Sequence, residues 1–213
     1  MNDYKEKILN ALKAIKREGI DKLVTYLENE TDFFTAPAST KYHSNYEGGL
    51  AEHSYKVMEL FKQKNEQFNL NIPMDSIIIC GLLHDLCKTN FYTKEKKNVL
   101  KGKKKVKKNR KINGQWMEVE EEVNDWQEEE GYTINDKLPL GHGCKSVILL
   151  QKFIQLTDFE IMAILFHMGI PEDYGMKQAY NKAVETFPAI IALHTSDYES
   201  SYFLEKTQNI NIK

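Results

Sequence analysis

Apolar residues recur at helical spacing over most of the chain. Near the start they occupy positions 8, 9, 12 and 15, and this stripe stops at Gly19. Further stripes cover residues 20–30, 50–68 and 75–88. An apolar residue at every third or fourth position gives a helix one apolar face that packs against a core. The pattern therefore predicts helices, and residues 1–40 contribute the first of them.

The helical pattern resumes in the second half of the chain, after residues 141–143. Helices are expected over residues 146–156, 161–168, 176–186 and 188–204. Thr157 and Glu160 have the spacing of a capping box, in which two side chains satisfy free amide groups at a helix N-terminus. Residues 31–46, with Pro37 and scattered Ser, Thr and Asn, indicate a loop. We expect a single helical domain over residues 1–213.

A charged segment at residues 94–136 interrupts this pattern. Between positions 94 and 111 there are eleven Lys or Arg and one Glu, and between 118 and 130 there are eight Asp or Glu and no basic residue. Asn113-Gly114 separates the two runs, and Asn-Gly between extended segments is a strong hairpin signal. We expect a basic strand paired with an acidic one, with a solvated, partly disordered insert as the alternative. The predicted fold class is all-α, a helical bundle with a charged β-hairpin insertion.

Composition excludes several classes of protein. The net charge is −2, so no general affinity for nucleic acid or acidic membranes is expected. The longest apolar run, residues 77–83, is far shorter than the roughly 20 residues of a membrane span. The first residues also lack the apolar run of a signal peptide. We expect a cytoplasmic protein with no membrane partner.

The three cysteines, Cys80, Cys87 and Cys144, form no Cys-x-x-Cys pair. Reduced thiols are therefore expected, as is usual in the cytosol. Cys87 and Cys144 do lie near His84 and His142 in the sequence, which makes a structural zinc site an alternative. Their spacing matches no common zinc pattern.

The most informative residues are His84 and Asp85, which are adjacent within an apolar run. Burying them is costly unless something satisfies them, and a divalent metal would do so. Further candidate ligands, each in its own apolar stretch, are His53, His142, His167 and Asp197. Such a mixed set of imidazoles and carboxylates suits Mn, Fe, Ni, Co or Zn better than calcium. Taken singly, each histidine is also typical of a hydrogen-bonded core residue, and Asp197 of an exposed helix residue.

Asp85 and Lys88 suggest a reaction. On a continuous helix, positions 84 and 88 share a face, as do 85 and 88, so Lys88 would lie beside the ligands and hold a phosphate oxygen. Asp85 has two oxygens and can bridge two metals. A dimetal site lowers the pKa of water and clamps the attacking and leaving oxygens of an in-line displacement at phosphorus. This chemistry is the hydrolysis of a phosphoester.

Five segments resemble, in order, the motifs of HD-domain metal-dependent phosphohydrolases. They are GGLAEHS at 48–54, GLLHDLCK at 81–88, GHG at 141–143, ILFHMG at 164–169 and LHTSD at 193–197. The resemblance spans about residues 41–201 without the charged insert. It implies a helical fold and a metal held by His53, His84, Asp85 and Asp197. It also implies a second metal at His142 and His167, with Asp85 as the bridge.

The resemblance extends to substrate-binding residues and has two departures. Lys88 matches a lysine that contacts substrate phosphate. His43 matches a histidine found upstream of the GGL segment in exonuclease-like members, although a loop histidine without a role is as common. Cys87 replaces a glycine, and Met168 replaces the second histidine of His-His-Gly, which leaves the occupancy of the second metal site open. His194 is expected beside the site rather than as a ligand.

The expected function is a metal-dependent phosphohydrolase that cleaves a phosphoester of a nucleotide or a related small phosphorylated substrate by a metal-activated hydroxide. Asp85 and Lys88 are its expected catalytic residues. One alternative is a 3′–5′ exonuclease or oligonucleotide phosphodiesterase that grips short single-stranded nucleic acid with the basic strand. Another is a non-catalytic module that binds metal or nucleotide. The sequence leaves the oligomeric state open.

Overall fold

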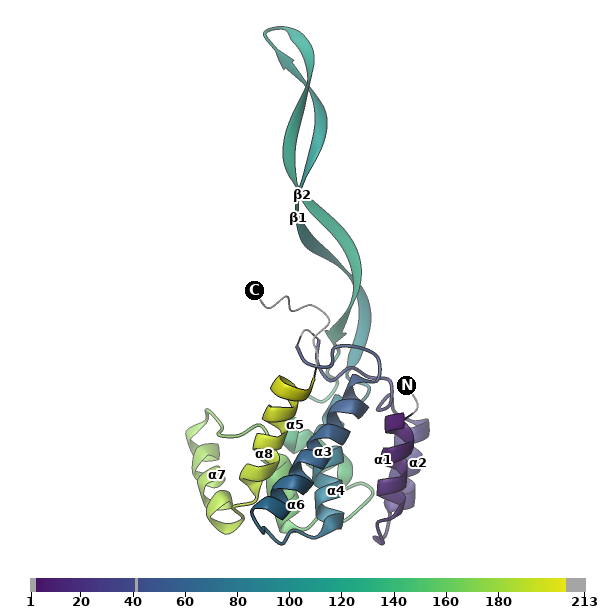
Figure 1. Ribbon diagram of the computed structural model, residues 1–213, viewed down its shortest axis with the longest axis vertical. Helices are drawn as coiled ribbons and strands as arrows, with labels where there is room; N and C mark the ends of the chain where they lie inside the picture. Colours follow the sequence, from purple (N-terminus) through teal and green to yellow (C-terminus); the bar gives the residue numbers. More distant parts are fainter. Residues whose placement is uncertain (1–2, 41, 206–213) are drawn as a thin grey trace. The chain divides into compact units, whose positions relative to one another are not determined.

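The computed structural model describes residues 3–40 and 42–205 of the chain. It divides into a helical body, Met1–Tyr92 with Ile134–Lys213, and a ribbon, Thr93–Thr133 (Figure 1). The elements of the body are α1 (Asp3–Lys13), α2 (Ile20–Asn29), α3 (Gly49–Gln67), α4 (Met74–Leu83), a 3₁₀ turn η1 (Leu86–Lys88), α5 (His142–Leu150), α6 (Asp158–Leu165), α7 (Tyr174–Thr186), α8 (Ile190–Glu199) and a π-helical turn η2 (Ser200–Leu204). No helix in the described ranges is long and apolar enough to cross a membrane.

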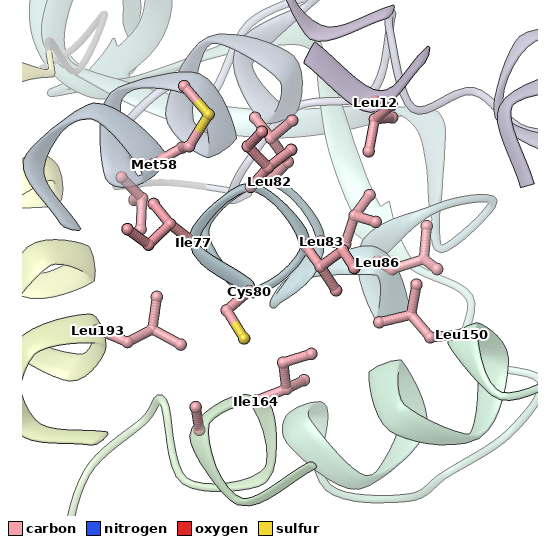
Figure 2. Packing of buried hydrophobic residues seen from close by; sticks show 14 of the residues in the cluster. Leu12, Met58, Ile77, Cys80, Leu82, Leu83, Leu86, Leu150, Ile164 and Leu193 are labelled. Atoms are coloured by element: carbon pink, nitrogen blue, oxygen red, sulfur yellow. The ribbon is translucent and has the colours of Figure 1, made fainter. Parts of the chain in front are cut away.

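Helix α4 forms the centre of the body. Every residue from Ser76 to Leu83 is buried, because this helix is apolar on all sides and must be enclosed. Figure 2 shows α4 end-on, with Leu82 and Leu83 directed towards different neighbours. The side chains that surround it come from α1, α3, α5, α6 and α8, as Leu12, Met58, Leu150, Ile164 and Leu193.

Glycines allow two pairs of helices to approach closely. A Cβ atom at Gly81 of α4 would lie 2.5 Å from the Cα atom of Met58 in α3. A Cβ atom at Gly143 of α5 would lie 2.2 Å from the carbonyl oxygen of Leu165 in α6. Contacts this short leave no room for a side chain. The helices that carry the candidate ligands are therefore in direct backbone contact.

The predicted capping box is confirmed at the start of α6. The amide of Glu160 donates to Oγ1 of Thr157, and the amide of Thr157 donates to Oε2 of Glu160. Glu160 has a second role, because its buried carboxylate also accepts two hydrogen bonds from Arg17 and one from Ser76. This cluster ties α6 to α4 and to the segment between α1 and α2.

Several predicted helix boundaries are wrong. Helix α4 ends at Leu83, so His84 and Asp85 follow it, and Lys88 belongs to the 3₁₀ turn η1. Two bonds tighten the chain here, since the amide of Lys88 donates to the carbonyl of Asp85 and Oγ1 of Thr89 donates to the carbonyl of Leu86. The expected helix 146–156 instead runs over His142–Leu150. The last α-helix ends at Glu199 and continues as a π turn.

The predicted all-α class is also wrong. The charged segment forms two antiparallel strands, β1 (Tyr92–Ile112) and β2 (Gln115–Ile134), 21 and 20 residues long. Between them Asn113 and Gly114 both have positive φ, as a tight primed turn requires. Opposite charges face each other along the ribbon, which favours pairing over its whole length. The ion pairs are Lys96–Glu128, Lys101–Glu129, Lys103–Glu122, Lys104–Asp125, Lys105–Glu120, Lys107–Glu118, Lys108–Glu121 and Arg110–Glu121.

Candidate metal centre

Two histidine rings meet where α3 packs on α4. His53 lies in the first turns of α3, His84 directly follows α4, and both are fully buried. Their Nε2 atoms are 3.2 Å apart. Asp197 of α8 places Oδ1 3.3 Å from Nε2 of His53. The ligand atoms of the three residues cluster, and one ion with metal–ligand bonds of about 2.0–2.2 Å can span the separations of 3.2 and 3.3 Å.

Asp85 lies between this group and a second one. Its Oδ2 atom is 3.6 Å from Nε2 of His53 and 3.6 Å from Nε2 of His84. Its Oδ1 atom is 3.5 Å from Nε2 of His167, the buried histidine that follows α6. His84, Asp85 and His167 form a second set of clustered ligand atoms. One carboxylate oxygen therefore faces each group.

His142 lies in a third set, with Asp85 and Cys87. It is the exposed member, at the start of α5, and its Nδ1 atom is 3.6 Å from the sulfur of Cys87. Burial and the charge of Asp85 raise the pKa of the Cys87 thiol to about 12, so the thiol stays protonated at neutral pH. Cys87 lies beside the centre, with its sulfur 3.9 Å from Oδ1 of Asp85.

The three buried histidines are oriented alike. Each donates a hydrogen bond from Nδ1: His53 to Glu205 at 2.7 Å, His84 to the carbonyl of Gly81 at 3.0 Å, and His167 to the carbonyl of Ile164 at 2.7 Å. Each Nε2 atom is thereby left to face the centre. Nε2 of His167 is buried and has no hydrogen-bond partner among the described residues. This is the arrangement that metal-binding histidines adopt, so these residues fit a divalent metal.

The charges of the centre are strongly coupled. Burial would raise the pKa of Asp85, but the charge of Lys88 and the neighbouring rings of His84, His167 and His53 hold it well below its ordinary value. Burial lowers the pKa of His84 to about 4, so this ring is neutral at pH 7. Burial also opposes charge on His53, yet Glu205, Asp197 and Asp85 raise its pKa well above its usual range. The centre therefore holds ionised carboxylates beside imidazoles.

The two predicted substrate-binding residues also lie at the centre. Nζ of Lys88 is 2.6 Å from Oδ2 of Asp85. Burial alone would lower the pKa of Lys88, but Asp85 and Tyr92 raise it, so the ammonium group stays charged. The half-buried ring of His43 lies 5.0 Å from the ring of His53, centroid to centroid. Nε2 of His43 is buried without a hydrogen-bond partner in the described part of the chain.

One residue of the centre was missed by sequence reasoning. Glu205 follows the π turn η2, and its buried carboxylate accepts from His53. No motif marks it, and it lies beyond the resemblance, which ends near residue 201. His194 is near the centre but not in the clustered sets, since its Nδ1 atom donates to the backbone carbonyl of His167. The structure thus brings together all the predicted site residues and adds Glu205.

Two known proteins are similar to parts of this chain. The chain is 31% identical over 107 residues to a dihydroneopterin 2′,3′-cyclic phosphate phosphodiesterase of Methanocaldococcus jannaschii, covering 42% of this chain and 43% of that protein. It is 33% identical over 88 residues to a 3′-5′ exoribonuclease YhaM of a Geobacillus species, covering 40% of this chain and 27% of that protein. The chain thus spans less than half the length of either relative.

No solved structure matches the chain with significance. The family model of the HD domain matches residues 50–201, which is more than half of the chain and includes every candidate ligand from His53 to Asp197. His43 and Glu205 lie outside the matched residues. On this match and on the clustered histidines and aspartates, the chain belongs to the HD-domain family.

Proposed function

We propose that this protein is a metal-dependent phosphohydrolase that cleaves a phosphoester of a nucleotide or a related small phosphorylated substrate. The observation that carries the proposal is the set of three buried histidines whose Nε2 atoms all face Asp85 or Asp197. Membership of the HD-domain family supports it. So do the names of the two relatives, a cyclic phosphate phosphodiesterase and an exoribonuclease.

The family resemblance suggests two metal sets that share one carboxylate. His53, His84, Asp85 and Asp197 would hold the first ion, and Asp85 with His142 and His167 a second. The clustering of His53, His84 and Asp197, of His84, Asp85 and His167, and of Asp85 with His142 supports this division. The mixture of imidazole and carboxylate favours Mn, Fe, Ni, Co or Zn. When bound, such a metal supplies Lewis-acid chemistry, by lowering the pKa of water and polarising a phosphoryl oxygen.

Lys88 would bind the phosphate. Its ammonium group is mostly enclosed, stays protonated and is directed at the carboxylate that faces both metal sets. A fixed positive charge in a partly dry site stabilises negative charge that develops on a reacting phosphate. His43, with an unsatisfied buried nitrogen beside His53, would donate a hydrogen bond to the substrate.

The test is metal analysis of the purified protein, followed by hydrolysis assays with a generic phosphodiester, nucleotides, cyclic nucleotides and short oligonucleotides. Asp85→Ala should reduce turnover to background while the helical circular dichroism signal is kept. Glu185→Gln, in an exposed ion pair with Lys182, is the matched control and should retain activity. If the wild-type protein loaded with Mn, Co or Ni cleaves none of these substrates, the proposal fails.

A second candidate is cleavage of short single-stranded nucleic acid, favoured by the lysine-rich strand β1. Against it, eight basic residues of the ribbon are paired with carboxylates of β2, and the ribbon contains eleven basic and nine acidic residues. Salt separates the two functions. Binding of a strand through several lysines weakens steeply as salt rises, whereas hydrolysis of a mononucleotide responds much less. A non-catalytic module would instead bind metal and show no turnover with any substrate.

A further inference from the structure

We propose that Glu205 is a positioning residue that sets the ring orientation of His53 for metal binding. This inference rests on the metal site of the proposed function. It concerns a residue outside the part of the chain that matches the HD domain. The residue also lies 152 positions from the histidine it contacts.

The carboxylate of Glu205 is held on three sides. Oε1 accepts from Nδ1 of His53 at 2.7 Å and from Oγ of Ser200 at 2.6 Å, and Oε2 accepts from Oγ of Ser44 at 2.6 Å. The side chain of Glu205 is fully buried, as are both serines. Three hydrogen bonds hold a buried carboxylate in one orientation, because any rotation would leave a buried donor or acceptor unsatisfied. Glu205 therefore presents a rigid acceptor to His53.

The position of His53 in α3 explains why a side chain, and not a backbone carbonyl, accepts the hydrogen bond from its Nδ1 atom. His84 and His167 follow the last residues of α4 and α6, and each donates to the carbonyl three residues earlier, where a helix end leaves acceptors free. His53 lies in the first turns of α3, where the preceding carbonyls accept the helix's own hydrogen bonds. No equivalent backbone acceptor is available to its ring, so Glu205 supplies one.

The consequence lies at the other ring nitrogen. With Nδ1 donating to Glu205, the Nε2 atom faces His84 and Asp197, at 3.2 and 3.3 Å. A carboxylate partner also makes the imidazole a stronger ligand than a carbonyl partner does. Without Glu205, the His53 ring is free to rotate or to carry its proton on Nε2. Either change removes one ligand of the first metal set.

The end of α8 and the turn that follows it place Glu205 beside His53. Helix α8 widens into the π turn η2, a geometry found at functional sites, and Glu205 follows directly. Nζ of Lys56 donates to the carbonyl of Leu204 at 2.9 Å, and Lys56 lies on α3 one turn beyond His53. The helix that carries the ligand thus also anchors the segment that orients it.

The test measures metal affinity directly, by isothermal titration with Mn²⁺ and Co²⁺, for the wild-type protein and for Glu205→Ala and Glu205→Gln. Loss of a partner of this kind lowers metal affinity about 10–100-fold, and this is expected for Glu205→Ala. Glu205→Gln keeps an oxygen that accepts from Nδ1, so it should restore part of the affinity. Glu199→Gln, which removes the charge of the last residue of α8 and its ion pair with Lys64 of α3, is the matched control and should bind as the wild-type protein does.

Three results would separate the possibilities. If the wild-type protein binds no divalent metal, the metal site itself fails, whatever Glu205 does. If it binds metal and Glu205→Ala binds equally well, the inference is overturned. If Glu205→Gln loses as much affinity as Glu205→Ala, Glu205 is a direct ligand with His43 and His53, whose ligand atoms also cluster, and the positioning role is wrong.

A second variant tests the inference if Glu205→Ala does not fold. If Glu205→Ala does not fold, Ser200→Ala removes one donor to Glu205 and leaves the His53 contact in place. A smaller loss of affinity in the same direction is then expected, and an unchanged affinity for both Ser200→Ala and Glu205→Gln overturns the inference. In the zinc-loaded protein, the protected Nδ1 proton of His53 should give a low-field NMR resonance that is lost in Glu205→Ala. A purely structural role would not remove it selectively.

Discussion

At the scale of single residues, buried charge occurs in two kinds of cluster. Around Glu160 the oxygens accept from Arg17, Ser76 and the amide of Thr157, so charge and hydrogen bonds are satisfied. Around Asp85, imidazole nitrogens face carboxylates at 3.3–3.6 Å, and Nε2 of His167 has no hydrogen-bond partner in the described residues. A satisfied cluster stabilises the fold. An unsatisfied buried cluster costs stability and is typical of a binding site.

Removing Arg17 should destabilise the protein strongly. Arg17→Ala leaves the buried carboxylate of Glu160 without its charged partner, which typically costs about 3–5 kcal/mol. The free energy of unfolding from urea titration at pH 7 is the measurement. Lys182→Ala, in an exposed pair with Glu185, should change it by no more than about 1 kcal/mol. Equal effects of the two variants would contradict the assignment of Arg17 as the charged partner that stabilises the buried carboxylate of Glu160.

The ion pair between Arg17 and Glu160 also predicts how the stability of the fold depends on pH. Burial would raise the pKa of Glu160, but hydrogen bonds from Arg17, Thr157 and Ser76 lower it below its ordinary value of 4.5. A carboxyl whose pKa is lowered by folding stabilises the folded state above its unfolded pKa, and this stability is lost as pH falls through the folded pKa. The urea concentration at the unfolding midpoint should therefore decrease as the pH is lowered below 4.5. The acid-induced fall should be smaller in Glu160→Gln, which has no such group to protonate.

At the scale of elements, close helix packing sets the distances in the centre. Gly81 lets α4 touch α3, and Gly143 lets α5 touch α6. His53 and His84 belong to the first contact, and His142 and His167 flank the second. Helices separated by a side chain would move these ring nitrogens apart. The glycines therefore matter for binding as well as for packing.

Gly81→Ala should separate α3 from α4. Alanine raises helix propensity by about 1 kcal/mol, yet its Cβ would lie 2.5 Å from Cα of Met58, and overpacking of this kind costs about 1–3 kcal/mol. We expect a net loss of stability and weaker metal binding, measured by thermal unfolding and calorimetric titration. Gly141→Ala, whose Cβ meets nothing within 4 Å, is the stability control. A Gly81→Ala protein more stable than wild type would contradict this packing.

The ribbon should be dispensable for metal binding. Oγ1 of Thr93 and Oγ1 of Thr133 are 2.9 Å apart, so the segment between them can be replaced by a two-residue Asn-Gly turn. All candidate ligands belong to the helical body. The shortened protein should keep its helical circular dichroism and its affinity for Mn²⁺. Loss of metal binding with the fold retained would show that the ribbon contributes to the centre.

At the scale of the whole molecule, the centre joins parts of the chain that are far apart in sequence. Its residues come from α3, the end of α4, the start of α5, the end of α6, α8 and the segment after η2. Six separate elements must be in place before the ligand atoms converge. Metal binding and folding of the body should therefore be linked.

Divalent metal should stabilise the folded protein. A ligand that binds only the folded state adds about 2.7 kcal/mol when its free concentration is 100 times its dissociation constant. Thermal unfolding with Mn²⁺ or Co²⁺ should show a higher midpoint than with a chelator. His53→Ala lacks one ligand of the first set and should show a much smaller increase. Equal increases in both proteins would place the stabilising ion elsewhere.

Much of the body was predictable because its signals are local. Helical periodicity located most helices, and the spacing of Thr157 and Glu160 predicted the capping box, which the structure confirms. The resemblance also led to the correct family. The roles of His53, His84, Asp85 and Asp197 stay predictions, although the structure brings these residues together. The end of α4 was predicted wrongly, where the amide of Cys87 donates to Oγ of Ser146, 59 positions away. The all-α class was wrong because it left out the long strands of the charged segment, whose pairing is local and was expected.

The sequence by itself determined the helical pattern, the charged opposing strands and the identity of the candidate ligands, because periodicity and motif spacing are properties of neighbouring residues. Tertiary structure alone decided which atoms meet. It placed both oxygens of Asp85 towards different histidines and brought Glu205 against His53 across 152 positions. No local pattern encodes that contact, because it depends on where α8 and its π turn pack against α3. The buried ring nitrogens are oriented by that packing.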